Sequence, residues 1–178
     1  MPDSMPLENR PIPIKFRGVF DWNQLYHTWI NWMKSQLMKY HENIYKDKPT
    51  AGNTREIELD CMGEVKIDEF HKWIVKVSIH IWDATPVEVV QEGKKRQMLR
   101  GRIYIIIKAE VLRDYQGVYD HTPLLQRARG LILKMTEWEE KIPIWDTYYY
   151  KTIKLHSLLK QALGMDTGGN PWQDVTDG

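Results

Sequence analysis

The chain has 178 residues, of which 42% are hydrophobic and 28% are charged, and its formal net charge is +1. That length suits one ordinary domain, and that composition excludes a largely disordered chain. The nearly neutral balance also lacks the basic excess that is typical of nucleic-acid-binding proteins, so charge alone favours no partner.

Residues 1–19 contain four prolines, each of which removes a backbone donor and favours an extended chain. The sequence therefore predicts an N-terminal arm that is disordered or lies along a surface. The arm lacks the apolar stretch of a secretory signal, so we expect a location in the cytoplasm or within an assembled particle. Apolar runs along the chain are far shorter than the roughly 20 residues that span a bilayer, so we expect no integral membrane protein.

A helix is predicted to begin after Phe20, because Asp21 can cap its N-terminus and Gln24 stands three residues later. Apolar residues then recur at spacings of three and four as far as Tyr40, which places them on one face. That aromatic face is expected to pack on a sheet. The segment 41–54 is predicted to be a loop, because proline, glycine and asparagine cluster near its end.

Apolar and polar residues alternate through the middle of the chain, which predicts half-buried strands. The acidic residues of the first strand should face lysines of the second across a hairpin. Runs of strands followed by runs of helices indicate an α+β fold. Four antiparallel strands are expected, at residues 54–68, 70–85, 87–90 and 98–115.

Two further helices are predicted after the strands. Thr122 can cap the first of them, and Pro123 occupies its first position, where a missing N–H is harmless. A break at residues 141–143 separates it from a last helix at about 144–163, for which Gly164 is a natural end.

One domain is therefore expected over residues 20–164. In it, a four-stranded antiparallel meander is packed on one face by the N-terminal helix and the two C-terminal helices. Residues 165–178 are rich in glycine and acidic residues, which predicts a flexible C-terminal tail.

Residue types that carry catalysis form no known constellation in this sequence. The six histidines lack the spacing of metal ligands, and the lone Cys61 lies on the apolar side of a strand, where a thiol is inert. The acidic row Glu56, Glu58, Asp60 and Glu64 has the composition of a cation site or of a glycoside-cleaving pair, but facing lysines favour a solvated strand face. We therefore expect a protein that is not an enzyme, with no catalytic residue, metal or cofactor.

Basic residues gather at the tip of a predicted hairpin, where five of them occur within nine positions. They can grip phosphates, pair with an acidic patch on another subunit, or form an ordinary charged surface. Aromatic residues do not alternate with them along the sequence, which argues against stacking of a single strand. These candidate interaction residues are Lys94, Lys95, Arg96, Arg100 and Arg102.

Aromatic residues are biased in kind, with eight Trp and nine Tyr against three Phe. Trp and Tyr combine a large contact area with a polar tip and are enriched at interfaces. Trp172, alone in the C-terminal tail, is a further candidate for contact with a neighbouring molecule.

Two short patterns carry a resemblance that extends over most of the chain. The first helix begins with the pattern F-D-x-x-x-L-Y, and the last helix carries an approximate W-D-x-x-Y-Y-x-x-x-x-L-H pattern. The chain thereby resembles a group of small α+β proteins, without an assigned activity, from archaeal and metagenomic sequences. The resemblance implies a source and no function. Its residues are Phe20, Asp21, Leu25, Tyr26, Trp145, Asp146, Tyr149, Tyr150, Leu155 and His156.

The leading hypothesis is a non-enzymatic structural or assembly protein that self-associates or scaffolds a complex, such as a virion, tail or filament component. The missing catalytic motifs, the Trp and Tyr surplus, the basic hairpin and the two extended ends favour it. One alternative is a nucleic-acid-binding module that uses the hairpin 94–102. Another is a helix-on-sheet cup for an apolar ligand, lined by Trp29, Trp73 and Tyr149.

Overall fold

The computed structural model describes residues 3–7, 12–50, 52–91 and 94–165. Within them the chain is α+β, as the sequence indicated, and its one antiparallel sheet has six strands. The strands are β1 (Asp3–Pro6), β2 (Ile12–Phe20), β3 (Lys39–Thr50), β4 (Thr54–Lys66), β5 (His71–Gln91) and β6 (Lys94–Arg113). The helical segments are α1 (Trp22–Ser35), the 3-10 turn η1 (Val118–Asp120), α2 (Pro123–Glu140), the π-helical turn η2 (Lys141–Trp145) and α3 (Asp146–Ala162).

The strand order is β1-β6-β5-β4-β3, and β2 also pairs with β6. Strands β3 to β6 form a meander, while the two short N-terminal strands share the outer edge of β6. β2 pairs with its first half, from Leu99 to Ile107, and β1 pairs with its second half, from Glu110 to Arg113. The N-terminal segment is thus tied to the last strand of the sheet, at pairs of residues that are 79 to 110 positions apart in sequence.

The expectation of four strands is corrected to six, and the differences have physical reasons. The prediction of a loop at 41–54 is wrong, because β3 occupies Lys39–Thr50. This edge strand is exposed along nearly all of its length, so it lacks the apolar alternation that marks a half-buried strand. The two strands expected at 70–85 and 87–90 are one strand, β5, which bends at a β-bulge between Trp82 and Thr85.

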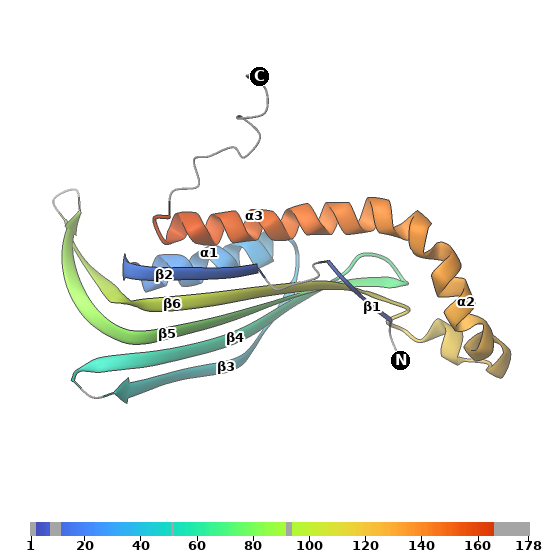
Figure 1. The fold of residues 1–178 in the computed structure, drawn as a ribbon, viewed down its shortest axis with the longest axis horizontal. Helices are drawn as coiled ribbons and strands as arrows, with labels where there is room; N and C mark the ends of the chain where they lie inside the picture. Colours follow the sequence, from blue (N-terminus) through green and yellow to red (C-terminus); the bar gives the residue numbers. More distant parts are fainter. Residues whose placement is uncertain (1–2, 8–11, 51, 92–93, 166–178) are drawn as a thin grey trace, which may run out of the picture.

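Helices α1 and α3 lie on the same face of the sheet (Figure 1). The inward residues of β4, β5 and β6 are buried beneath them, as the alternation predicted. Trp32 of α1 packs edge-on against Trp73 of β5, with ring centroids 5.7 Å apart, and Leu155 and Leu159 of α3 are fully buried. Burial of each such side chain supplies about 1.5–3 kcal/mol, so this layer holds the fold together.

The predicted starts of the first two helices and the predicted end of the last one are confirmed by their caps. The helical pattern expected as far as Tyr40 is wrong at its end, because α1 stops at Ser35 and Tyr40 lies in β3. The break expected at residues 141–143 is the π-helical turn η2. Asp21 Oδ1 accepts a hydrogen bond from the backbone N–H of Gln24 at 3.0 Å. Thr122 Oγ1 accepts one from the N–H of Leu125 at the start of α2, although at a longer 3.3 Å. Gly164 follows α3 in the left-handed conformation, with a φ of 67°, which favours glycine.

Helix α2 lies past the end of the sheet, at the side of the molecule where β5 begins and β6 ends (Figure 1). Two interactions join it to that end. Arg113 Nη1 donates to the carbonyl oxygen of Leu133 at 3.0 Å, and Arg129 Nε lies 3.4 Å from the buried carboxylate of Asp114.

Candidate functional site on the open face of the sheet

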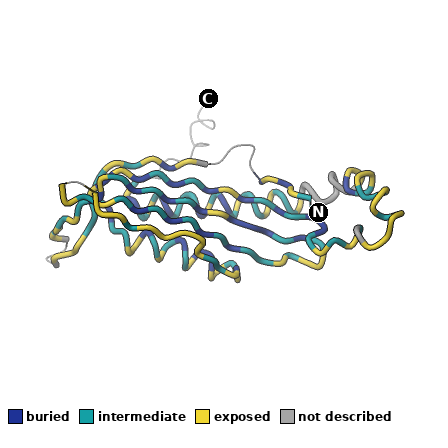
Figure 2. The backbone as a smooth tube through the Cα atoms, turned by 90° about the horizontal axis from the view of Figure 1, so that it is seen from below, coloured by how far each residue is buried: buried dark blue, intermediate teal, exposed yellow. Residues whose placement is uncertain are grey.

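The polar residues of the alternation lie on the sheet face that is turned away from α1 and α3. Buried and less buried positions alternate along the strands (Figure 2). The charges on this open face are divided between strands. A row of carboxylates lies on β4, while exposed cations stand on β2 and on the first half of β6.

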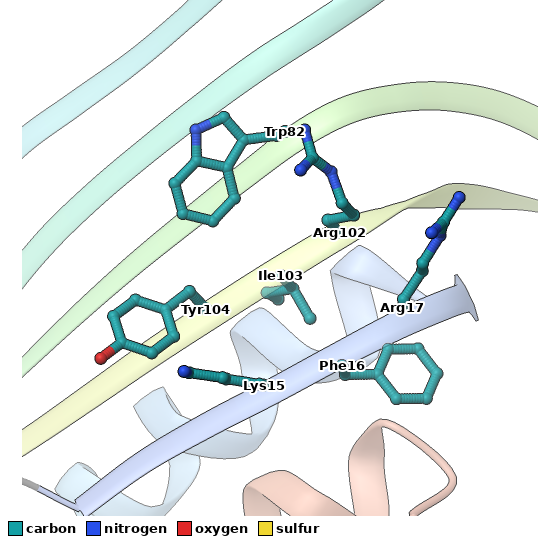
Figure 3. A pocket seen from close by; sticks show the side chains of 7 residues that line it. All are labelled: Lys15, Phe16, Arg17, Trp82, Arg102, Ile103 and Tyr104. Atoms are coloured by element: carbon teal, nitrogen blue, oxygen red, sulfur yellow. The ribbon is translucent and has the colours of Figure 1, made fainter.

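A depression of about 500 Å³ opens on this face where β2, β6 and β5 run side by side (Figure 3). The sheet register brings its residues together, because Arg102 pairs with Arg17 on one side and with Trp82 on the other. In the same way, Tyr104 pairs with Lys15. The lining residues are Lys15, Phe16, Arg17, Trp82, Arg102, Ile103 and Tyr104.

Two aromatic rings form the apolar part of this depression. Trp82 and Tyr104 are half-buried and also line a second depression of about 370 Å³, which extends toward β4. The Trp82 ring is held by a stacked contact with His80, at 3.9 Å between centroids and 18° between planes. Since His80 Nε2 lies 2.6 Å from a carboxylate oxygen of Glu56, the indole orientation is supported from β4.

Cations flank the two rings. Lys15 Nζ stands 5.6 Å from the centroid of the Tyr104 ring, and Arg102 Cζ stands 6.0 Å from that of Trp82. A third depression of about 500 Å³ adjoins the first and adds Arg100 to Arg17 and Arg102. Among the residues that the structure describes, Arg102 is paired with Asp83, whereas Lys15, Arg17 and Arg100 form no ion pair. We call these three adjoining depressions the binding groove.

The predicted basic cluster is divided by the fold. Arg100 and Arg102 line the binding groove. Lys95 pairs instead with Glu88, at 3.5 Å, and Arg96 is exposed nearer the hairpin tip. The side chain of Lys94 and the whole of Trp172 lie outside the described residues.

Sequence reasoning missed Lys15, Arg17, Trp82 and Tyr104. Lys15 and Arg17 belong to a proline-rich segment that was interpreted as an arm. Trp82 and Tyr104 occupy outward positions of their strands, and large aromatic residues at such positions are a signal that alternation alone could have given. Basic and aromatic residues do interleave here, across neighbouring strands rather than along one.

Asp83 is also placed differently from the expectation. In an unbroken strand, residues three apart face opposite sides of the sheet, so Asp83 would point away from the face of His80. The β-bulge between Trp82 and Thr85 breaks the alternation, and Asp83 has a φ of 56°. As a result the Asp83 carboxylate reaches Arg102 on the open face.

The acidic row of β4 is neutralised by several partners. Lys72 pairs with Glu64 at 3.5 Å, as expected across the β4–β5 hairpin. Glu58 is paired from the other side, by Lys46 of β3 at 3.2 Å, and this hydrogen bond holds the pKa of Glu58 below its usual value. Ligand atoms of Glu56, Glu58 and His80 lie within 4.8 Å of one another, a spacing that a metal ion could bridge. The ion pairs already account for this cluster, so we assign no metal to it.

Cys61 is buried on the inward side of β4, which confirms the structural role predicted for it. Burial raises the pKa of its thiol to about 12, despite a contact with the Tyr40 hydroxyl at 3.7 Å that opposes the shift. Nearby, the hydroxyls of Tyr26 and Tyr40 both donate to one Glu42 oxygen, at 2.9 and 2.7 Å. Burial is the main cause that raises the pKa of both phenols, and the hydrogen bonds to Glu42 raise it further. The cluster therefore supplies no anionic nucleophile near neutral pH.

No protein-family model matches this chain, and no curated protein does either. Among the helices of the described residues, none is both long and apolar enough to cross a membrane. Because one fold can serve many activities, function has to be inferred from the chemistry of the binding groove.

Proposed function

We propose that this protein binds single-stranded nucleic acid in the binding groove on the open face of its sheet. The observation that carries the proposal is the position of Trp82 and Tyr104, half-buried and accessible, between the cations Lys15 and Arg102. Each ring offers a flat face to a base, while each cation can meet a phosphate.

The chemistry of the groove fits an unpaired strand better than a duplex. Stacking on an aromatic side chain supplies about 1–3 kcal/mol per base, but only when the base face is free, as it is in single strands. Lys15, Arg17 and Arg100 have no ion pair with a described residue, so their charges are available to phosphates without first breaking a contact. The nearly neutral net charge does not oppose this proposal, because the exposed cations of β2 and β6 gather in one part of the binding groove, while Glu58 and Asp60 of β4 line its other end.

A pocket for an apolar ligand between helices and sheet is disfavoured by the packing there. Trp29 and Trp73 are completely buried. The Trp73 ring lies 4.6 Å from that of Tyr148, and the Trp29 ring lies 4.8 Å from that of Tyr40. These rings fill the space that a ligand would need. Self-association is a second candidate function, favoured by three exposed apolar side chains on α2, which are Leu124, Leu131 and Met135.

Fluorescence anisotropy with a labelled oligothymidine of about 16 nucleotides, the upper end of common site sizes, tests the proposal. Trp82→Ala and Tyr104→Ala should each weaken binding by roughly 5- to 150-fold, which corresponds to the loss of one stacked base. Tyr150→Ala is the matched control, because Tyr150 is an exposed aromatic residue on α3. Equal losses in all three variants, or no binding by the wild-type protein, would contradict the proposal.

The salt dependence of the same binding tests the role of the cations. Three phosphate contacts, from Lys15, Arg17 and Arg100, predict a slope of log affinity against log salt of about −2. Arg17→Ala should reduce the steepness by about 0.7, while Lys154→Ala on α3 should leave it unchanged. A slope that is insensitive to Arg17→Ala would place the strand elsewhere on the surface.

A further inference from the structure

The end of the binding groove that lies toward β4 has a chemistry of its own. This depression of about 370 Å³ is lined by the rings of Trp82 and Tyr104, and Asp60 and Glu58 bring carboxylates to it from β4. Ile106 follows Tyr104 on the same face of β6 and is half-buried, so an apolar surface adjoins the tyrosine ring. A flat ring with an acceptor at one edge therefore fits this end of the groove.

Asp60 is the carboxylate here that is open to a ligand. Glu58 accepts a hydrogen bond from Lys46 of β3 at 3.2 Å, so its charge is already compensated. Asp60 is half-buried, and in the described ranges its side chain has no ion pair and no hydrogen bond. Ser78 lies opposite Asp60 in the register of β4 and β5 and lines the same depression. An acceptor and a hydroxyl thus stand side by side at the edge of the rings.

The sheet register places the cations, the rings and Asp60 in one line across the strands. Lys15 pairs with Tyr104, Tyr104 with His80, and His80 with Glu58, which is two residues from Asp60 on the same face. Three strand spacings of about 4.8 Å separate β2 from β4, or roughly 14 Å. Lys15 extends toward β6, with Nζ 5.6 Å from the centre of the Tyr104 ring, which shortens this span (Figure 3). A nucleotide whose phosphate lies at β2 therefore points its base toward β4.

The bases differ in what they offer to a carboxylate, which can only accept hydrogen bonds. Guanine presents two neighbouring donors on its Watson–Crick edge, N1–H and the N2 amino group, which match the two oxygens of a carboxylate. Adenine and cytosine present one amino group beside a ring nitrogen that is an acceptor. Thymine and uracil present one N–H between two carbonyl oxygens, which a carboxylate repels. The hydroxyl of Ser78 can in addition donate to O6 of guanine, so guanine complements this end best.

We propose that the binding groove prefers single strands that contain guanine, because Asp60 accepts hydrogen bonds from the Watson–Crick edge of a guanine that lies against Tyr104. This inference rests on the proposed function and adds to it the base that the groove selects. It also agrees with binding of an unpaired strand, since that edge of guanine is occupied in a duplex.

Fluorescence anisotropy with two labelled strands of the same length tests the preference. One is the 16-nucleotide oligothymidine, and the other carries guanine at every fourth position. The wild-type protein should bind the guanine strand about five- to tenfold more tightly, the lower end of what a bidentate contact supplies, because water reaches the groove. Asp60→Asn should abolish this ratio without weakening the binding of oligothymidine. Glu64→Gln is the matched control, because Glu64 lies on β4 outside the depression, and it should leave the ratio unchanged.

A third strand separates hydrogen bonding from stacking and needs no variant. Inosine in place of guanine keeps the purine ring, N1–H and O6 but lacks the N2 amino group, so the wild-type protein should lose most of its preference. Equal affinity for the guanine strand and oligothymidine, with both still weakened by Trp82→Ala, would overturn this inference alone. A preference that survives Asp60→Asn would also overturn it. If the wild-type protein binds none of the strands, the proposed function fails and this inference fails with it.

Discussion

The carboxylate of Asp83 holds the guanidinium of Arg102 across the β5–β6 pair, with Oδ2 lying 2.9 Å from Nε and 2.7 Å from Nη2. The contact is possible because the β-bulge after Trp82 turns Asp83 toward the open face. Both side chains are more than half exposed, so the pair contributes little to stability. Its main effect is on the binding groove, where the Asp83 carboxylate neutralises Arg102, one of the four cations.

Asp83→Asn is therefore expected to strengthen nucleic-acid binding. Asparagine tolerates the left-handed backbone that Asp83 adopts, so the bulge should persist. Arg102 is then free to meet a phosphate, and affinity should rise about two- to five-fold at low salt, with a steeper salt dependence. Anisotropy titrations at two salt concentrations measure both effects. A weaker affinity, with unfolding unchanged in urea, would show that Asp83 assists binding instead.

Gly101 is required by the close approach of β5 at the same bulge. A Cβ at this position would lie 2.8 Å from the carbonyl oxygen of Trp82 and 3.3 Å from Cα of Ala84, both backbone atoms that cannot move aside easily. Gly101→Ala should therefore lower the free energy of unfolding by about 1–3 kcal/mol in urea titrations.

Gly130→Ala is the matched comparison, because a Cβ there meets nothing within 4 Å and Gly130 lies inside α2. This change should raise the free energy of unfolding by about 0.5–1 kcal/mol, since alanine is the better helix former. If Gly101→Ala were as stabilising as Gly130→Ala, the close approach at the bulge would have to be rejected.

The sequence predicted those parts of the fold that depend on local residue patterns. Asp21 and Gln24 marked the start of α1, and the inward residues of β4, β5 and β6 followed from alternation. Strand β3 was missed because an exposed edge strand has no buried face, so its sequence lacks the alternation of apolar and polar residues. Strands β1 and β2 were missed because their prolines favour a bare arm, yet prolines are tolerated at the edge of a sheet.

The binding groove was only half predictable, because it depends on register. Arg100 and Arg102 stood out as a basic cluster, but their aromatic neighbours come from other positions in the chain. Trp82 meets Arg102, and Lys15 meets Tyr104, only through the pairing of β6 with both β5 and β2. No pattern within one strand encodes such pairs, and the bulge at Asp83 shifts them further.

Glu110 of β6 links three strands, because it accepts hydrogen bonds from Ser4 of β1 and from Lys76 of β5. Burial alone would raise the pKa of Glu110, but the hydrogen bonds from Ser4 and Lys76 outweigh it and hold the pKa below the ordinary 4.5. A lowered pKa in the folded state means that the carboxylate stabilises the fold above about pH 4.5. That contribution is lost as the pH falls through the folded value.

Glu110→Gln should accordingly lower the free energy of unfolding by about 0.5–1 kcal/mol at pH 7, discounted for partial exposure. The difference from the wild-type protein should shrink as the pH falls below 4.5, where both side chains become neutral. Urea titrations between pH 7 and pH 3 measure it. Glu88→Gln, which removes a more exposed ion pair with Lys95, is the control and should have a smaller effect at pH 7. A difference for Glu110→Gln that is constant with pH would mean that charge is not its cause.

Cys61 should be unreactive toward iodoacetamide in the folded protein. The thiol is 2% exposed in the core, and burial raises its pKa to about 12, so almost no thiolate exists at pH 8. Modification should therefore accelerate only when urea unfolds the chain, which mass spectrometry can follow. A Thr50→Cys variant in a Cys61→Ala background provides the exposed control and should react at once. Rapid labelling of Cys61 in native buffer would mean that the β4 face beneath α1 opens readily, against the packing described here.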